Sequence, residues 1–321
     1  MNTTKKQKCS NASAKSDFIE IVIIGPQTLY LDKNKRLRRV LCLLQWVKCF
    51  WKQRQKIMVA APNVWNEGSV RASIQAAENC KSPVILNFFF QKNDPNPMQT
   101  MQDQMKFSAD WARRASVPIA INLDHGAKFE HAMWAICGGA TSIMVDRSTL
   151  PYEENVAQVL ELTRIAHAVN VSVEAELGHV GQGSNYQHDG KALLTEPEEA
   201  ARFVQATGVD CLAVAIGTAH GPYAGTPHID FERLDEIRQA VDVPLVLHGG
   251  SGTGDENLAK ATKSGINKVN LFTDLVVAGT EKLKETGFTS YRIQNLENIM
   301  FDGFREKLEY YMNLFGCANQ A

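Results

Sequence analysis

Three histidines in this chain each follow a short apolar run: His125, His220 and His248. Short runs rich in β-branched residues and bounded by Gly, Pro or polar residues are typical of buried strands. Imidazoles at the exits of three such strands could converge on one Zn²⁺ and leave a fourth coordination position open for a substrate. A single histidine after a strand is usually structural, but three in equivalent places favour a metal site.

A carboxylate directly precedes the first of these histidines. Asp124 would emerge near the rim of its strand, where a general acid or base could reach a substrate. The alternative is that Asp124 only orients the imidazole of His125. Polar residues stand at the ends of most of the other candidate strands as well. Together they are Asn63, Asp124, His125, Asp146, Glu174, Glu176, His220, His248, Ser251 and Asn270.

Two glycine-containing turns add a possible anion site. Residues 249–252 read Gly-Gly-Ser-Gly after the seventh candidate strand, and residues 270–273 follow the eighth. Exposed backbone N–H groups and a helix N-terminus commonly hold phosphate at this place in a barrel. Metal beside phosphate indicates a phosphorylated substrate whose carbonyl or hydroxyl is polarised by the metal.

The elements that must position these residues alternate regularly. The candidate strands are residues 58–62, 83–89, 117–122, 141–145, 171–176, 209–216, 243–248 and 266–270. The candidate helices are residues 67–80, 99–115, 128–137, 153–169, 197–206, 231–240, 255–263 and 273–285, with a further helix at about 294–315. Eight alternating pairs predict a closed (β/α)₈ TIM barrel, an α/β fold whose active site lies at the carboxyl ends of the strands. An open doubly wound sheet is the alternative.

Composition agrees with an ordinary globular enzyme. The chain has 321 residues, of which 44% are hydrophobic and 21% charged. Its seven cysteines are scattered and odd in number, which indicates reduced thiols and a cytoplasmic location. No apolar run approaches the roughly 20 residues needed to cross a bilayer, so we expect no membrane span.

The motifs around these residues resemble one family. Residues 123–126, 173–178, 215–221, 247–252 and 268–270 are similar to those of the class II, metal-dependent ketose-bisphosphate aldolases, which include fructose-bisphosphate and tagatose-bisphosphate aldolases. The resemblance covers about residues 58–321. It implies that His125, His220 and His248 bind catalytic Zn²⁺ and that Asp124 handles the proton on the C4 hydroxyl. Asp146 and Glu176 match residues near the metal, at a possible second site for Na⁺ or K⁺.

The resemblance also implies a substrate and an assembly. The residues that would bind the substrate, mostly its dihydroxyacetone-phosphate half, are Asn63, Gly221, Gly249, Ser251, Asn270 and Thr273. The expected reaction cleaves or forms a ketose 1,6-bisphosphate or a related phosphorylated ketose, with glyceraldehyde 3-phosphate as a typical aldehyde product. The expected assembly is a homo-oligomer, either a dimer or a tetramer, without nucleic acid. A competing hypothesis is a catalytically weak barrel that supports another subunit.

The chain departs from the family pattern in three places. The segment after the fifth strand lacks the usual glutamate that exchanges a proton with the enediolate, and Tyr186, His188 and Asp189 are the candidate replacements. Phe272 stands where fructose-bisphosphate enzymes have an aspartate. Residues 87–94 replace the family's Ser-x-Gly-Ala stretch.

A lysine-based Schiff-base mechanism is the chemical alternative to a metal. It requires a desolvated lysine on a barrel strand. Lys268 is the one close candidate, and we expect it at an exposed strand start.

The first 57 residues form an atypical basic N-terminal segment, separate from the barrel domain at 58–321. Residues 1–57 contain 13 Lys and Arg against three Asp and Glu, whereas the remainder contains 21 against 32. Residues 37–51 could form a basic helix at a membrane surface or across the barrel bottom. A shifted reading frame or a misplaced start would also explain the change in charge, and a basic tail for nucleic acid is a further hypothesis.

Overall fold

The computed structural model describes residues 20–24, 27–31, 37–38, 58–90, 94–181, 183, 194–221, 223, 227–287 and 292–321. The barrel strands are β4 (Val59–Val64), β5 (Val84–Phe88), β6 (Ile119–Gly126), β7 (Ser142–Val145), β8 (Ser172–Leu177), β9 (Cys211–Val214), β10 (Leu245–Leu247) and β11 (Ile266–Leu271). The helices are α2 (Glu67–Cys80), α3 (Pro97–Ala112), α4 (Phe129–Gly138), α5 (Tyr152–Ala168), α6 (Pro197–Thr207), α7 (Phe231–Ala240), α8 (Asp255–Lys263), α9 (Thr273–Glu285) and α10 (Ile293–Leu314).

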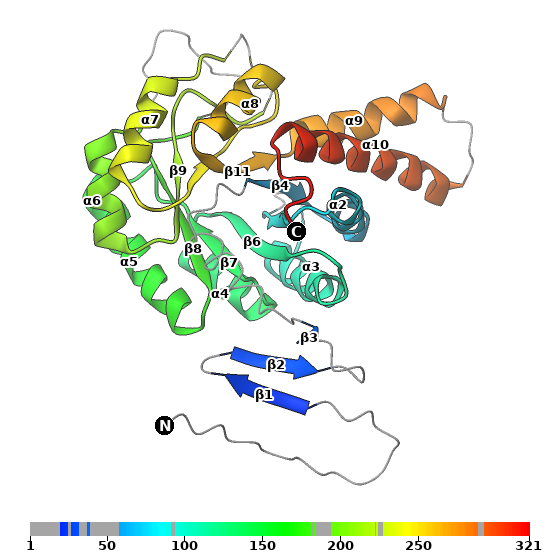
Figure 1. Ribbon diagram of the computed structural model, residues 1–321, viewed down its shortest axis with the longest axis horizontal. Coiled ribbons are helices and arrows are strands. Elements are labelled where there is room, and N and C mark those ends of the chain that lie inside the picture. The colour runs from blue at the N-terminus through cyan, green and yellow to red at the C-terminus, as the bar shows by residue number, and fades with distance from the viewer. Residues whose placement is uncertain are drawn as a thin grey trace.

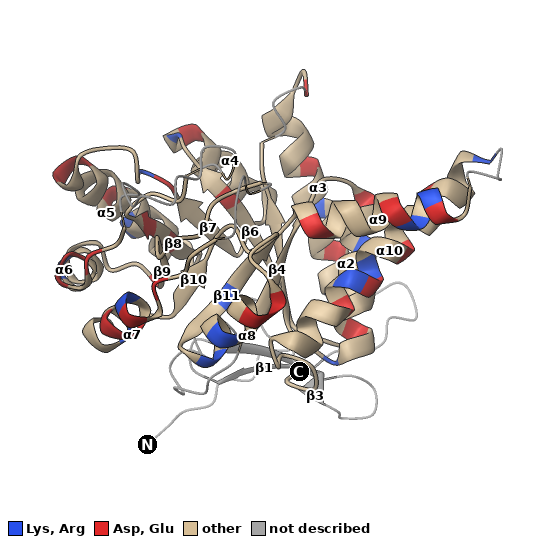
Figure 2. Cartoon of the chain, turned by 90° about the horizontal axis from the view of Figure 1, so that it is seen from above, with Lys and Arg blue, Asp and Glu red and all other residues tan. Residues whose placement is uncertain are grey.

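The eight strands close into a parallel barrel in the order β10-β11-β4-β5-β6-β7-β8-β9, surrounded by helices (Figure 1). The predicted TIM barrel is therefore confirmed, and the open doubly wound sheet is wrong. Each strand is almost wholly buried, because its outer face meets helices and its inner face meets the other strands. Charged side chains gather on outer helices such as α7, α8 and α9 (Figure 2). No helix in the described ranges combines the length and apolar composition that a membrane crossing requires.

The inside of the barrel carries an unusual run of amides. Asn63 pairs in register with Asn87, and Asn87 pairs in register with Asn122 on the next strand. Asn122 Nδ2 donates to Asn87 Oδ1 at 3.0 Å, and Ser142 Oγ donates to Asn122 Oδ1 at 2.7 Å. These buried polar groups thus satisfy one another across the strands β5, β6 and β7.

Helix α10 is the extra C-terminal helix expected from the sequence. It packs against α2 and α9, beside the barrel (Figure 1). The crossing with α9 is close, since a Cβ built on Gly303 would lie 2.6 Å from the Ala278 carbonyl oxygen. A residue without a side chain is therefore required at this point of the crossing.

Replacing Gly303 by Ala is expected to lower the free energy of unfolding by about 1–3 kcal/mol. Helix propensity alone would make alanine more stabilising than glycine by up to about 1 kcal/mol. The expected decrease in stability therefore reports the steric clash and not helix propensity. Urea denaturation of this variant and of an exposed α10 control, Glu297→Ala, measures the effect. A Gly303→Ala protein as stable as the control would show that α9 and α10 can separate without cost.

The N-terminal segment contains structure that the sequence did not lead us to expect. Strands β1 (Glu20–Ile24), β2 (Gln27–Leu31) and β3 (Leu37–Arg38) form an antiparallel sheet in that order. The proposed helix at 37–51 begins with strand β3 instead, and its remaining residues lie outside the described ones.

Candidate active site and metal centre

The three histidines singled out by the sequence meet at the carboxyl end of the barrel. His125 lies at the end of β6, His220 follows β9, and His248 follows β10. One ring nitrogen from each lies within 4.8 Å of the others. His125 has φ = +50°, a left-handed backbone conformation that is uncommon outside glycine. Such strain persists where the surrounding structure holds it, which is typical of functional sites.

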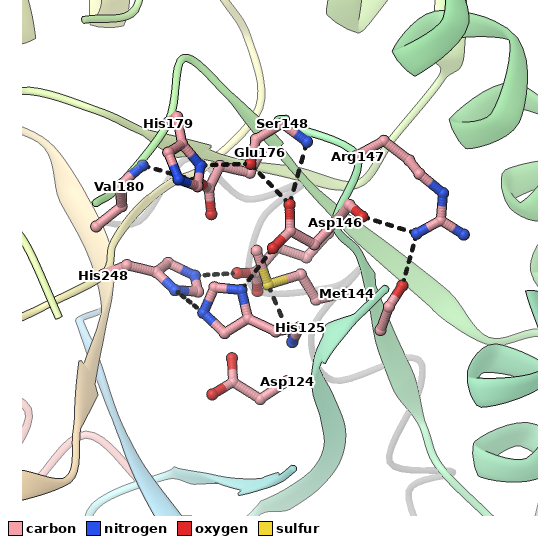
Figure 3. A network of polar contacts seen from close by, with 12 residues as sticks. Asp124, His125, Met144, Asp146, Arg147, Ser148, Glu176, His179, Val180 and His248 are labelled. Atoms are coloured by element: carbon pink, nitrogen blue, oxygen red, sulfur yellow. Dashed lines mark hydrogen bonds and ion pairs between the residues drawn. The ribbon is translucent and has the colours of Figure 1, made fainter. Parts of the chain in front are cut away.

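Two carboxylates fix the orientation of two of these imidazoles. His125 Nδ1 lies 2.8 Å from Asp146 Oδ2, and His248 Nε2 lies 2.8 Å from Glu174 Oε1 (Figure 3). A ring nitrogen that faces a carboxylate carries the proton, so the other nitrogen of each ring presents a lone pair. Those two nitrogens, His125 Nε2 and His248 Nδ1, lie only 3.1 Å apart. At this distance the two nitrogens can share a proton, which the raised pKa of His125 allows, or a metal ion that replaces this proton.

The third imidazole also offers an unused nitrogen. His220 Nε2 is buried and has no hydrogen-bond partner among the described residues. Burial and the neighbouring His248 and His125 lower the pKa of His220 to about 3, so its ring is neutral. Three imidazole nitrogens with an open fourth position are the donor set of catalytic Zn²⁺, which displaces protons from its ligands when it binds. The residues therefore fit this metal.

The surroundings of the histidines favour positive charge. Burial lowers the pKa of His125, but the charge of Asp124 and the hydrogen bond to Asp146 outweigh it and raise the pKa to about 9. A site that favours a proton on an imidazole by this much also favours a bound cation.

Asp124 is held by two amides and not by an imidazole. Its Oδ2 accepts a hydrogen bond of 2.7 Å from Asn63 Nδ2, and its Oδ1 accepts one of 3.0 Å from Asn270 Nδ2. Burial raises the pKa of Asp124, yet the charges of His125, His248 and Lys268 lower it to about 2. Asp124 is thus ionised and fixed beside the three histidines. The role of orienting the imidazoles falls to Asp146 and Glu174.

A second group of candidate ligands shares His125. His125, Asp146 and Glu176 also bring ligand atoms within 4.8 Å of one another. Glu176 Oε1 accepts a hydrogen bond of 2.9 Å from the Val180 N–H, whereas its Oε2 is buried without a partner among the described residues. Ser148 closes the group, since its hydroxyl donates to Asp146 Oδ1 at 2.8 Å (Figure 3).

The proposed phosphate-binding residues lie at the ends of neighbouring strands. Gly249 and Ser251 follow β10, while Asn270 and Thr273 lie at the end of β11 and the start of α9. Gly249 has φ = +66°, and a Cβ there would lie 2.2 Å from the Ala219 carbonyl oxygen, so only glycine fits. Ser251 Oγ accepts hydrogen bonds of 3.2 Å from the N–H groups of residues 272 and 274. This hydroxyl therefore sits at the N-terminus of α9, where a helix favours an anion.

Tyr223 ties the histidine loop to the phosphate loop, and sequence reasoning missed it. Its hydroxyl accepts from the Ala219 N–H at 2.8 Å and donates to the Gly249 carbonyl at 3.0 Å. Gly221 lies between Ala219 and Tyr223 in the sequence, directly after His220. No periodicity marks Tyr223, because it lies in a loop and acts through backbone contacts.

The expectation that Lys268 is exposed is wrong. Its side chain is only 3% exposed, and Nζ lies 2.8 Å from Glu174 Oε2. Lys268 and Asn270 lie two residues apart on β11, so both face the barrel interior. The ion pair with Glu174 keeps Lys268 from acting as a free amine nucleophile. The candidate proton carriers Tyr186, His188 and Asp189 lie outside the described residues.

The chain matches the family model "Fructose-bisphosphate aldolase class-II" over residues 51–320. It belongs to the class II fructose-bisphosphate aldolase family. The match begins slightly before the barrel boundary at residue 58 that the sequence predicted.

Solved structures of class II aldolases support this assignment. The YdjI aldolase from Escherichia coli K12 is 34% identical, with a TM-score of 0.75 over 87% of this chain and 98% of that one. A putative fructose-1,6-bisphosphate aldolase from Coccidioides immitis is 30% identical, with a TM-score of 0.75 over 88% and 97%. Fructose-bisphosphate aldolase from Campylobacter jejuni, 23% identical, shares the fold with a TM-score of 0.73 over 87% and 95%. The chain is therefore an aldolase, a carbon–carbon lyase.

Proposed function

We propose that this class II aldolase is Zn²⁺-dependent and acts on a ketose 1,6-bisphosphate or a related phosphorylated ketose. The products are dihydroxyacetone phosphate and an aldehyde such as glyceraldehyde 3-phosphate. The observation that carries the proposal is the close approach of ring nitrogens of His125 and His248, 3.1 Å apart, beside the His220 nitrogen that has no partner among the described residues. A bound Zn²⁺ supplies Lewis-acid polarisation of the ketone carbonyl.

Asp124 performs the proton transfer in the proposed reaction. In cleavage, its ionised carboxylate takes the proton of the C4 hydroxyl while the C3–C4 bond breaks. The electrons of that bond remain on the ketone fragment as an enediolate, and the other fragment leaves as an aldehyde. Asn63 and Asn270 hold both carboxylate oxygens, which keeps Asp124 aimed at the hydroxyl through the reaction.

The remaining residues bind and orient the substrate. Gly221, Gly249, Ser251 and Thr273 hold the phosphate of the dihydroxyacetone-phosphate half, with α9 directing its N-terminus at the anion. Asp146 and Glu176 hold a second, monovalent cation, Na⁺ or K⁺, through their carboxylate oxygens. The cation offsets the charge of the two carboxylates next to the catalytic metal.

Removal of the metal tests the proposal. Dialysis against a chelator is expected to abolish release of dihydroxyacetone phosphate, and added Zn²⁺ is expected to restore it. Mg²⁺ serves as the control, because it prefers oxygen ligands and should not restore activity at three imidazoles. Full activity in protein shown to be metal-free by elemental analysis would refute the Zn²⁺ assignment.

We further propose a cytoplasmic homo-oligomer, a dimer or a tetramer. Among the described residues, Cys80, Cys137, Cys211 and Cys317 are free thiols, which suits a reducing compartment. A barrel that only supports another subunit gains no support from the site, since Asp124 and the three histidines are all held in place.

A further inference from the structure

Three neighbouring barrel strands end in the same pair of residue types. Strands β11, β4 and β5 are adjacent, and each carries an asparagine followed two positions later by an aromatic residue. The pairs are Asn270 and Phe272, Asn63 and Trp65, and Asn87 and Phe89. Each aromatic residue directly follows the last residue of its strand, at the carboxyl end of the barrel.

The ring of Phe272 contacts the rings of both Trp65 and Phe89. The centroids of Phe89 and Phe272 are 5.3 Å apart, and those of Trp65 and Phe272 are 5.9 Å apart, both in edge-to-face geometry. We name Trp65, Phe89 and Phe272 the aromatic wall. Phe272 is 39% exposed and directly follows β11, so an apolar part of the wall is open to solvent at the carboxyl end of the barrel.

The aromatic wall is anchored to the body of the protein. Trp65 packs edge-to-face on Phe304 of α10, with centroids 5.8 Å apart. The Trp65 N–H donates to Ser69 Oγ at 3.0 Å, and the Trp65 carbonyl accepts from Gln104 Nε2 at 2.6 Å. The wall is therefore a fixed surface whose shape does not depend on a bound substrate.

The amides beneath the wall show which half of a substrate would meet it. Asn63 and Asn270 both donate to Asp124, the group that receives the C4 hydroxyl proton in the proposed reaction. C4 is the first carbon of the aldehyde half. Asn63 and Asn270 stand two positions before Trp65 and Phe272, so a chain that continues beyond C4 starts beside Asp124 and close to these two rings.

We propose that the aromatic wall selects a ketose 1-phosphate whose aldehyde half is uncharged. This inference rests on the proposed function and narrows its substrate. Phe89 and Phe272 have no hydrogen-bond donor, so a terminal phosphate against them would lose hydration without compensation. The C–H surface of an uncharged chain gains from burial against the rings. Phe272 also replaces the aspartate of the fructose-bisphosphate enzymes, which marks this position as one where the pocket differs.

The test compares two aldehydes that differ only in a phosphate. With saturating dihydroxyacetone phosphate, we expect kcat/KM at least about tenfold higher for D-glyceraldehyde than for D-glyceraldehyde 3-phosphate, a factor typical of one pocket contact. Phe272→Lys should reduce this ratio at least about tenfold, because the ammonium pairs with the phosphate. Phe272→Leu, which keeps an apolar surface, is the matched control and should retain the ratio.

One further measurement separates this inference from the proposed function. Exchange of the dihydroxyacetone-phosphate C3 proton with D₂O, followed by NMR without any aldehyde, reports the first half of the aldolase reaction alone. Exchange together with equal or better use of D-glyceraldehyde 3-phosphate would overturn the role of the aromatic wall and leave the proposed function intact. Absence of exchange would overturn both. If Phe272→Lys fails to fold, Phe89→Ser takes its place in the test. This variant is also expected to reduce the ratio of kcat/KM for D-glyceraldehyde to kcat/KM for D-glyceraldehyde 3-phosphate.

Discussion

Replacing Asp124 by Asn is expected to lower kcat by on the order of 10²–10⁴-fold, while zinc content and KM stay near those of the wild type. The amide occupies the same space, but it cannot accept the C4 hydroxyl proton. Its NH₂ group would also face an amide donor from Asn63 or Asn270, so a small loss of stability is expected. Steady-state kinetics, elemental analysis and thermal denaturation of the purified variant measure the three effects.

Asp146→Asn provides the matched control for this variant. Asp146 contacts the His125 imidazole directly, so its replacement should weaken metal binding about 10–100-fold. Its effect on the proton transfer by Asp124 should be smaller. Unchanged turnover in Asp124→Asn would return Asp124 to a merely structural role. Zinc loss in Asp124→Asn equal to that in Asp146→Asn would do the same.

Replacing His220 by Ala is expected to have the largest effect on the metal. Of the three histidines, His220 is the one whose buried Nε2 has no partner among the described residues. The substitution therefore removes a metal ligand without breaking a hydrogen bond of this nitrogen. Two remaining imidazoles bind Zn²⁺ poorly, and we expect affinity to fall by more than about 100-fold, beyond the loss caused by an orienting partner. Activity should fall below detection at ordinary zinc concentrations.

His131→Ala is the control for the His220 variant. His131 Nδ1 is also buried without a partner among the described residues, but its ring stacks on Phe90, with centroids 3.8 Å apart, and lies outside both groups of candidate ligands. It should keep full zinc content, as measured by elemental analysis. A His220→Ala protein that retains stoichiometric zinc would contradict the proposed centre.

Strand ends were the part of the site that could be predicted from sequence. The apolar runs before His125, His220 and His248 identify buried strands, and parallel strands in a barrel bring their carboxyl ends together. The same reasoning placed Asp124 beside the histidines. The sequence did not decide whether Asp124 orients an imidazole. That depends on which carboxylates lie next to His125 Nδ1 and His248 Nε2.

The misplacement of Lys268 has a physical cause. A lysine early in a strand is usually solvated, since burying an ammonium is costly. Here Glu174, across the barrel on β8, offsets that cost, and sequence separation hides the pairing. The available signal was the two-residue spacing from Lys268 to Asn270, because Asn270 was already expected to bind the substrate and residues two apart share a face of a strand. Strands β1 and β2 are short apolar runs separated by a Gly-Pro pair, which is the sequence signal for two strands joined by a turn.

The buried charges at the barrel mouth do not balance by themselves. Asp124, Glu174 and Glu176 are buried carboxylates and Asp146 is partly buried, whereas the cationic groups beside them are Lys268, Arg147 and the protonated ring of His125. Electroneutrality inside this cage thus calls for cations from solution, and a divalent ion together with a monovalent one would supply the missing positive charge. Cation binding would then reduce the repulsion among the carboxylates as well as complete the site. The stability of the folded protein would therefore depend on the supply of cations.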